Sequence, residues 1–219
     1  MIKIIKGSLL IIIMFILTGC ATNRGYLNIT VPQETISQQN GMQVYIRSIQ
    51  DNREFQIKPS SPDIPSYGSK KDQAEQTMKN RTIARKRNGY GKAMGNIFLD
   101  ENQSVQTVVY EAVKNSLYGL GYEVTDSKDS AKKDAILMDI SIDKFWSWIN
   151  MGVWTLRIDT VIKTTISIVT PAKTFIIETY VKNPCQVGNT ANWKKSIRIA
   201  INNYMSSIKD KLKCLPNGC

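Results

Sequence analysis

Apolar side chains occupy nearly every second position over residues 154–168. Successive side chains of a β-strand point to opposite faces of the sheet, so this spacing predicts one long strand with a core face and a solvated face. A turn at Pro171-Ala172-Lys173 and a second alternating run over residues 175–181 then predict a hairpin. The core face of the long strand carries Trp154, Leu156, Ile158, Thr160, Ile162, Thr164, Ile166 and Ile168.

The remaining elements follow from the same kind of pattern. Alternation predicts strands over residues 44–49 and 136–142, and apolar positions spaced by three and four predict helices over 104–119 and 191–213. This order predicts an α+β fold, with a mostly antiparallel sheet of about four to five strands and two helices packed on one face. The domain is expected to span residues 42–213, with a basic loop inserted at about 52–100 and a tail at 214–219.

The composition limits the chemistry that this chain can perform. Its 219 residues include no histidine, which excludes His-based catalytic triads, His-ligated zinc and His proton shuttles. We therefore expect no enzymatic activity, no catalytic residues, no metal and no cofactor. The formal net charge of +11 favours an acidic partner.

The first 20 residues have the pattern of an export signal. Lys3 and Lys6 precede an unbroken apolar run, Leu9–Leu17. This run is shorter than the roughly 20 residues that a membrane-spanning helix needs, and it fits a signal peptide. Leu17-Thr18-Gly19-Cys20 follows and resembles the lipobox of bacterial lipoproteins at all four positions.

The lipobox resemblance implies a location. Residues 1–19 would be cleaved, and Cys20 would carry acyl chains that anchor the protein stably in a membrane. Ala21 and Thr22 lack the Asp that signals inner-membrane retention in such lipoproteins, so we expect an outer-membrane lipoprotein that faces the periplasm. Residues 20–41 are expected to form a polar tether, interrupted by a short edge strand through Leu27, Ile29 and Val31.

A run of basic residues is the strongest candidate for a binding site. Two interpretations stand. In the first, the run binds lipid A phosphates, anionic lipid headgroups, peptidoglycan carboxylates or an acidic protein face, and its glycines let the backbone approach an anion. In the second, it is a solvated, mobile loop outside the core. Nucleic acid is not expected, because the leader directs the chain out of the cytosol. The candidate residues are Lys79, Arg81, Arg85, Lys86, Arg87, Gly89 and Gly91.

Two further groups of side chains have alternative interpretations. The aromatic residues Phe145, Trp146, Trp148 and Trp154, together with Met151, form either an exposed contact site or the cap of the core. Asp139 and Asp143 lie about 13 Å apart along a strand, too far for a glycosidase carboxylate pair, so we expect them to be solvated surface residues.

The cysteines that follow Cys20 suggest one disulfide. A Pro-Asn-Gly turn lies between Cys214 and Cys219 and favours a bond between these two residues. Cys185 would then be free or paired with another molecule. A catalytic thiol is not expected, because the chain has no histidine to activate it.

The order of these elements on a lipobox-bearing chain resembles the YajG-type family of uncharacterised Gram-negative lipoproteins. The matching features are the lipobox, the strand that ends in Asp51-Asn52-Arg53, the helix over 104–119 that runs into Gly-Tyr-Glu-Val, the long hairpin and the C-terminal helix. The insertion between Asp51 and Asp100 departs from shorter members. The resemblance implies a location and a fold and no known activity.

Three functions are compatible with these features. The first is a non-enzymatic binding or accessory subunit of a periplasmic envelope assembly, such as cell-wall synthesis, transport, secretion or flagellar assembly. The second is direct binding of an anionic envelope component, lipopolysaccharide or peptidoglycan. The third is a hydrolase that uses carboxylates alone, which would lose its activity on a single Asp or Glu change.

Overall fold

The computed structural model describes residues 24–36, 38–67, 76–88, 90–152, 155–213 and 215. The predicted signal peptide and lipidation site therefore lie outside the described residues, as does the predicted disulfide. The individual residues concerned are Cys20, Gly89, Trp154, Cys214 and Cys219.

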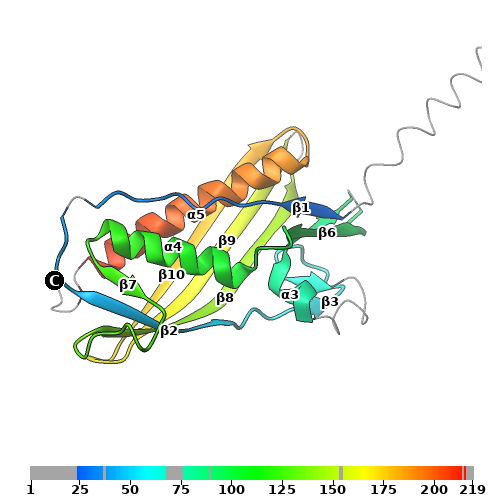
Figure 1. The fold of residues 1–219 in the computed structure, drawn as a ribbon. Coiled ribbons are helices and arrows are strands. Elements are labelled where there is room, and N and C mark those ends of the chain that lie inside the picture. Colours follow the sequence, from blue (N-terminus) through cyan, green and yellow to red (C-terminus); the bar gives the residue numbers. More distant parts are fainter. Residues whose placement is uncertain are drawn as a thin grey trace, which may run out of the picture.

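A long strand, β8 (Ile136–Met151), organises the sheet (Figure 1). One edge of β8 pairs antiparallel with β9 (Leu156–Ile168), and β9 in turn pairs antiparallel with β10 (Lys173–Cys185). This arrangement confirms the predicted long strand and its hairpin partner. As the alternation indicates, Ile158 and Ile162 of β9 are fully buried.

The other edge of β8 is divided between two strands. Its first half pairs parallel with β2 (Gln43–Asp51), up to Asp51 opposite Ile142. Further along, Ser147 of β8 pairs parallel with Ala84 of β5 (Thr82–Arg87). The sheet therefore splits along this edge, with one set of strands continuing from β2 and another from β5.

Short strands extend both parts of the split sheet. β7 (Glu123–Thr125) pairs parallel with β2. On the other part, β6 (Ala93–Leu99) pairs antiparallel with β5, and β1 (Gly25–Leu27) pairs parallel with β6. A separate two-stranded sheet consists of β3 (Gln56–Ile57) and β4 (Ser66–Tyr67).

The prediction of a mostly antiparallel sheet of four to five strands is wrong. In the described part of the chain the main sheet is mixed and has eight strands, and four of its seven pairings are parallel. β2 and β8 are parallel because the chain between them crosses over through a helix, which returns it in the same direction. Alternation in a sequence reports the face that a residue occupies and carries no information about the direction of a neighbouring strand.

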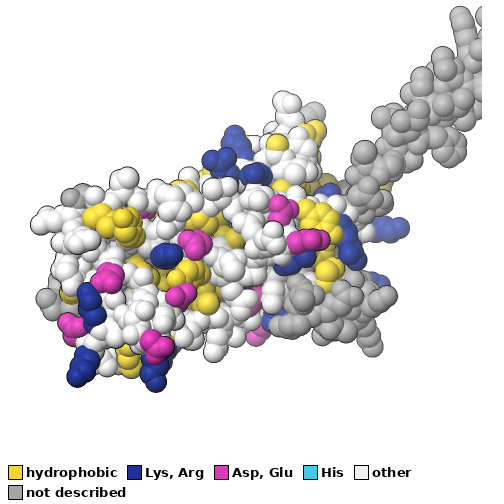
Figure 2. All heavy atoms as spheres, viewed as in Figure 1, with side chains coloured by type: hydrophobic (Ala, Val, Ile, Leu, Met, Phe, Trp, Pro, Cys, Tyr) yellow, Lys and Arg dark blue, Asp and Glu magenta, His cyan; other side chains and the backbone are white. Residues whose placement is uncertain are grey.

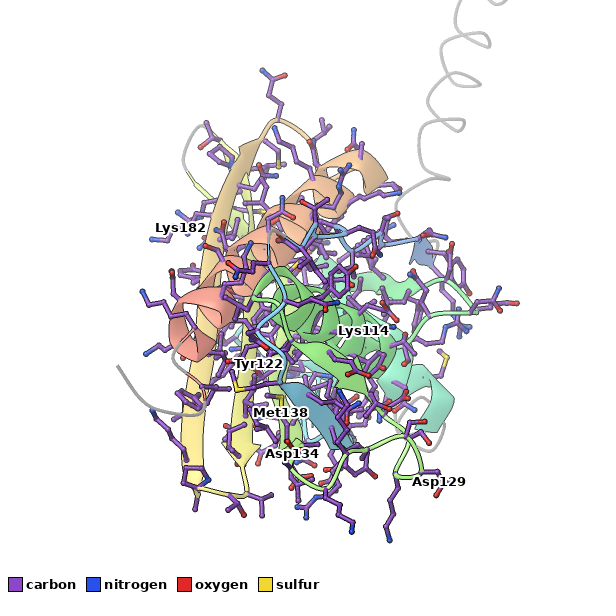
Figure 3. The ribbon with its side chains drawn as sticks, turned by 60° about the vertical axis from the view of Figure 1, so that its left-hand side comes forward. Lys114, Tyr122, Asp129, Asp134, Met138 and Lys182 are labelled. Atoms are coloured by element: carbon purple, nitrogen blue, oxygen red, sulfur yellow. The ribbon has the colours of Figure 1, made fainter. Side chains whose placement is uncertain are left out.

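Two helices cover one face of the sheet, as predicted (Figures 1 and 3). α4 (Val105–Gly119) begins at a capping box, in which Ser104 and Thr107 each accept a hydrogen bond from the other's backbone N–H. α5 (Thr190–Leu212) begins at Asn189, whose side chain caps the first turn. A third helix, α3, was not predicted and lies in the basic stretch described below.

The prediction of a polar tether before the domain is wrong for its described part, residues 24–36 and 38–40. These residues form a strap that packs across the two helices (Figure 1). The Ile29 N–H donates to Gln103 Oε1 (2.9 Å) and its carbonyl accepts from Gln103 Nε2 (2.7 Å). Asn115 on α4 donates to the Pro32 carbonyl (2.8 Å). Lys209 on α5 pairs with Glu34 (2.7 Å). The strap is therefore fixed to both helices.

The basic stretch is also not the inserted loop that the sequence predicts. Its first residues form α3 (Gln76–Arg81), which runs directly into β5. A turn over residues 88–92 then leads into β6. β5 lies inside the main sheet, between β8 and β6, so these basic residues belong to the body of the domain.

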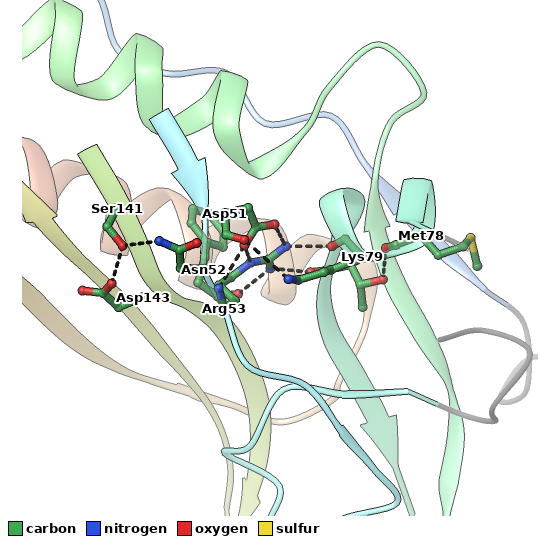
Figure 4. Close-up of polar contacts among 9 residues, drawn as sticks. Asp51, Asn52, Arg53, Met78, Lys79, Ser141 and Asp143 are labelled. Carbon is green, nitrogen blue, oxygen red and sulfur yellow. Dashed lines mark hydrogen bonds and ion pairs between the residues drawn. The ribbon is translucent and has the colours of Figure 1, made fainter. Parts of the chain in front are cut away.

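Arg53 fills the split between β2 and β5 (Figure 4). It is 1% exposed, and its guanidinium forms a bidentate ion pair with Asp51, with both contacts at 2.8 Å. The same group donates to the backbone carbonyls of Thr82 (2.7 Å), Phe145 (3.2 Å) and Lys79 (2.7 Å). These carbonyls come from β5, β8 and α3, so one side chain ties the three elements together where the sheet ladder is interrupted.

Candidate anion-binding site

A pocket of about 410 Å³ lies between the β5–β6 hairpin and the segment that follows β3. Four of its seven described lining residues are Lys or Arg, and none of the seven is acidic. Such a concave, single-sign surface concentrates positive potential and attracts an anion. The lining residues are Lys58, Pro59, Arg85, Arg87, Gly91, Lys92 and Ala93.

Strand geometry brings two arginines to the pocket. Side chains alternate along β5, so Arg85 and Arg87 share one face of the strand and Lys86 occupies the other. Lys86 accordingly lies beside β1, where its Nζ is 3.6 Å from the position that a Cβ on Gly25 would take. Arg85 is 8% exposed. A guanidinium so placed presents a fixed fork of donors that suits phosphate or carboxylate oxygens.

Arg87 joins the two walls of the pocket. Its Nη2 donates to the Pro59 carbonyl (2.9 Å) and the Ser61 carbonyl (3.4 Å), and its Nη1 donates to the Ser60 carbonyl (3.3 Å). These partners are neutral, so they position the guanidinium without cancelling its charge. The Nε of Arg87 is buried and has no hydrogen-bond partner. A buried donor left unpaired is costly, so the three carbonyl contacts must hold this side chain in place.

The tip of the hairpin is shaped by side-chain and backbone turns. Asn88 Oδ1 accepts from the N–H groups of Tyr90 (3.1 Å) and Lys92 (2.9 Å). Gly91 has a φ of +76° in this turn, a conformation that costs glycine little. On the facing wall Lys58 has a φ of +49°, which is uncommon for a residue with a side chain. Both turns expose their lysine side chains.

The structure separates the predicted basic residues into two groups. Arg85, Arg87 and Gly91 line the pocket, whereas Lys79 and Arg81 make contacts inside the fold. Lys79 Nζ donates to the Asp51 carbonyl (3.4 Å), and Arg81 donates to the Leu99 carbonyl through Nε (3.1 Å) and Nη2 (2.9 Å).

Sequence reasoning missed both lysines that line the pocket, Lys58 and Lys92. Lys92 directly follows Gly91, so including the whole turn would have found it. Lys58 lies far from the basic run in the sequence, and no local pattern connects it with that run.

The predicted aromatic cluster is divided between the two faces of the sheet. Phe145 belongs to the main core beneath the helices. Trp146 and Trp148 form a smaller cluster on the opposite face, where Phe55 packs on them and the indole of Trp146 donates to the Pro62 carbonyl (3.0 Å). Met151 is 46% exposed. The cluster therefore joins the β3–β4 segment to the sheet and does not form a single contact site.

The two predicted surface carboxylates are held in hydrogen bonds along β8. Asp139 accepts from Arg47 (3.0 Å) and Ser48 (2.8 Å), and the hydrogen bond from Arg47 holds the pKa of this carboxyl below its usual value. Asp143 accepts from Ser141 and Thr165, each at 2.7 Å. These contacts bind the carboxylates to the sheet surface.

Asp159 is a buried carboxylate on the same outer face of the sheet. Burial raises its pKa, but hydrogen bonds from Arg157, Tyr180 and Asn150 outweigh this effect and leave the pKa below its ordinary value. Tyr180 also stacks on Trp148, with ring centroids 5.9 Å apart. The group is a satisfied polar cluster that supports the β8–β9–β10 surface.

The described residues contain no cluster that would suit a metal ion, because nowhere among them do three or more Cys, Asp or Glu side chains converge. No helix in the described part of the chain is long and apolar enough to span a membrane. Cys185 is a free thiol there, and burial raises its pKa, which disfavours the reactive thiolate.

Comparison with known proteins gives weak structural likenesses. No family model matches the chain, and no curated protein matches it in sequence. A Xanthomonas campestris protein of family DUF330 superposes with a TM-score of 0.46 at 11% identity, over 87% of this chain and 94% of that one. An uncharacterised protein gives 0.45 at 7% identity, over 83% and 99%.

A neuraminyllactose-binding hemagglutinin homolog from Helicobacter pylori is a further structure of this kind. It gives a TM-score of 0.39 at 10% identity, over 85% of this chain and 92% of that one. None of these comparisons names the YajG-type family, and that resemblance stays a prediction. Likeness at this level carries no argument about function.

Proposed function

We propose that this chain is a lipid-anchored outer-membrane protein that faces the periplasm and serves as a non-enzymatic binding or accessory subunit of an envelope assembly. The assembly would serve cell-wall synthesis, transport, secretion or flagellar function, and the predicted lipid anchor and the basic pocket support this proposal. In this proposal Cys20 carries the lipid and the basic pocket holds an anionic group of the envelope. The observation that carries the binding role is a concave surface whose described lining residues include four cationic side chains and no acidic one.

A second candidate function is direct binding of lipopolysaccharide or peptidoglycan through the same pocket. Its concave shape favours this reading, because a pocket of about 410 Å³ admits a phosphate or carboxylate together with part of a sugar. A flat acidic protein face would touch the rim alone. The two candidates differ in the source of the anion and share its chemistry.

The anchor is tested by Cys20→Ser in the native host. We expect this variant to remain as an uncleaved or soluble precursor and to leave the outer-membrane fraction, because it lacks the sulfur that accepts the lipid. Mass spectrometry of the wild-type protein should show acyl chains on Cys20. Unchanged membrane fractionation of Cys20→Ser would contradict the lipoprotein proposal.

The pocket is tested by in-cell cross-linking from its rim. Tyr90 is 98% exposed at the hairpin tip, so a photoreactive amino acid placed there samples whatever occupies the pocket. The double variant Lys58→Gln/Lys92→Gln should reduce the yield strongly. The matched control is Lys195→Gln/Arg198→Gln, which removes two charges from the exposed face of α5.

The chemistry of the adduct distinguishes the two candidates. A protein adduct supports the accessory-subunit function, and a glycan or lipopolysaccharide adduct supports direct binding. Equal yields from the pocket variant and the control variant would overturn the pocket as the binding site in both cases.

A further inference from the structure

β1, β3 and β6 lie at the same end of the molecule (Figure 1), and residues that follow β3 and that begin β6 line the basic pocket. β1 and β6 are parallel, with Gly25 opposite Ile97. The chain that precedes Gly25 therefore enters from the side of β6 that leads back to the hairpin turn. Ala93, which lines the pocket, lies four residues before Ile97 on β6, about 13 Å toward that side at the rise of a strand.

The connection from this end to the proposed lipid is short. Cys20 precedes Gly25 by five residues, which span at most about 18 Å when fully extended. The domain is much longer than this, since the 16 residues of β8 extend over roughly 50 Å. A chain anchored at Cys20 therefore keeps the β1 end of the domain near the membrane and the opposite end away from it.

The strap provides no additional slack. Gln103 holds both the N–H and the carbonyl of Ile29, Asn115 holds the Pro32 carbonyl, and Lys209 pairs with Glu34. Releasing the strap to lengthen the connection would expose Leu27 and Ile29, which are at most 2% exposed. The described domain thus begins almost at the membrane.

The surface brought to the membrane is positively charged. Lys58 and Lys92 are exposed on the two sides of the pocket, and Arg85 and Arg87 form its base. Figure 2 shows Lys and Arg side chains near β1 and β6 at this end, with Asp and Glu side chains beside them. Ala93 lies about 13 Å beyond the position opposite Gly25, on the side from which the anchored segment enters, so the pocket is nearer to the anchored end of the chain than Gly25 is. Basic side chains are attracted to an anionic headgroup layer within the screening length, which is about 8 Å at physiological salt.

We infer that the basic pocket faces the membrane that carries the lipid anchor and takes the phosphate of a phospholipid headgroup in that leaflet. The inference rests on the lipid anchoring proposed above and deepens it by naming the occupant of the pocket. The positive charges of Arg85 and Arg87 at the base of the pocket, with those of Lys58 and Lys92, suit a phosphate group. The helices and the β8–β9–β10 surface then remain available to periplasmic partners.

Energy transfer to the membrane surface tests this orientation. The lipidated protein, purified from membranes, is reconstituted into vesicles that contain a headgroup-linked acceptor dye. A donor dye is attached through Tyr90→Cys at the hairpin tip or through Asp129→Cys on the turn before β8. The segment between β7 and β8 lies at the end of the molecule opposite β1 (Figure 1). Both proteins carry Ser at Cys185, Cys214 and Cys219 so that the label is unique.

Charge dependence tests the occupant. Vesicles of phosphatidylglycerol are compared with vesicles of phosphatidylcholine, with Lys58→Gln/Lys92→Gln as the pocket variant and Lys195→Gln/Arg198→Gln as the control. We expect at least twofold more transfer from position 90 than from position 129 on phosphatidylglycerol. Each charge near an anionic surface changes the docked-to-undocked ratio about fivefold, so the pocket variant should lose roughly 25-fold in this ratio and the control should lose little.

The outcomes separate this inference from the proposed function. Protein without acyl chains on Cys20 overturns the anchor and the inference together. Lipidated, vesicle-bound protein with equal or greater transfer from position 129 overturns the orientation and leaves the anchor intact. Greater transfer from position 90 that depends neither on lipid charge nor on Lys58 and Lys92 overturns the headgroup phosphate as the occupant.

Discussion

Arg53 places a buried charge where two strands leave the same edge of β8. Its five hydrogen bonds satisfy the Asp51 carboxylate and three carbonyls that no neighbouring strand can reach. The Asp-Asn-Arg sequence was noted only as part of a family resemblance. Nothing in the local pattern shows that this arginine turns inward, because the three carbonyls that it binds belong to residues that are distant in sequence.

Truncating this side chain should strongly destabilise the protein. Arg53→Ala removes the bidentate partner of the buried Asp51 carboxylate, which keeps only the hydrogen bond from the backbone N–H of residue 53 (3.2 Å), and it removes a donor from three carbonyls. We therefore expect the free energy of unfolding to fall by about 3–5 kcal/mol, measured by urea denaturation. Arg47→Ala is the control, because Arg47 pairs with Asp139 near the surface and should change stability little. Similar losses in the two variants would contradict the structural role given to Arg53.

Asp159 predicts a particular dependence of stability on pH. Its folded-state pKa lies below the ordinary value of 3.8, so its contribution to stability is fully present above about pH 4 and is lost as the pH falls through the folded-state pKa. Asp159→Asn removes this titration. The drop in the urea midpoint between pH 5 and pH 3 should be smaller for Asp159→Asn than for the wild type, and an equal drop would argue against the assignment.

At the scale of elements, the strap depends on one side chain for its central contact. Gln103 binds both polar groups of the Ile29 peptide, and Ile29 itself is buried. Gln103→Ala should lower the free energy of unfolding by about 1–3 kcal/mol, the value expected for two hydrogen bonds, and should speed amide exchange in residues 27–33. Asn102→Ala, at an exposed neighbouring position, is the control. Unchanged exchange in the strap would show that its apolar contacts suffice.

The elements that the sequence predicted are those whose burial follows a regular period. β9, β10, α4 and α5 each bury one face, and their apolar residues repeat every two or every three to four positions. β5 escaped prediction because its last three residues, Arg85, Lys86 and Arg87, are all basic. Charged residues on both faces of a strand cancel the alternation, although Arg85 is buried and Arg87 is held by three carbonyls.

For the whole molecule, topology was the part least accessible to sequence. The parallel pairing of β2 with β8 and of β1 with β6 depends on long-range contacts that alternation does not report. The full lining of the candidate site was also not predictable from the sequence, because it too depends on long-range contacts. Its arginines stand in one basic run, but the facing wall around Lys58 comes from another segment, and the pocket exists only because Arg87 joins the two.

The arrangement of the sheet predicts one cooperative unfolding transition. β8 pairs with β9 along one edge and with both β2 and β5 along the other, so neither part of the split sheet keeps its ladder once β8 unfolds. In a Trp154→Phe/Trp193→Phe background, the fluorescence of Trp146 and Trp148 reports on the outer face, and the far-ultraviolet circular dichroism reports largely on α4 and α5. The two signals should therefore give the same urea midpoint. An earlier fluorescence transition would mean that the β3–β4 segment unfolds as a separate unit, with the pocket wall that contains Lys58 lost before the rest of the sheet.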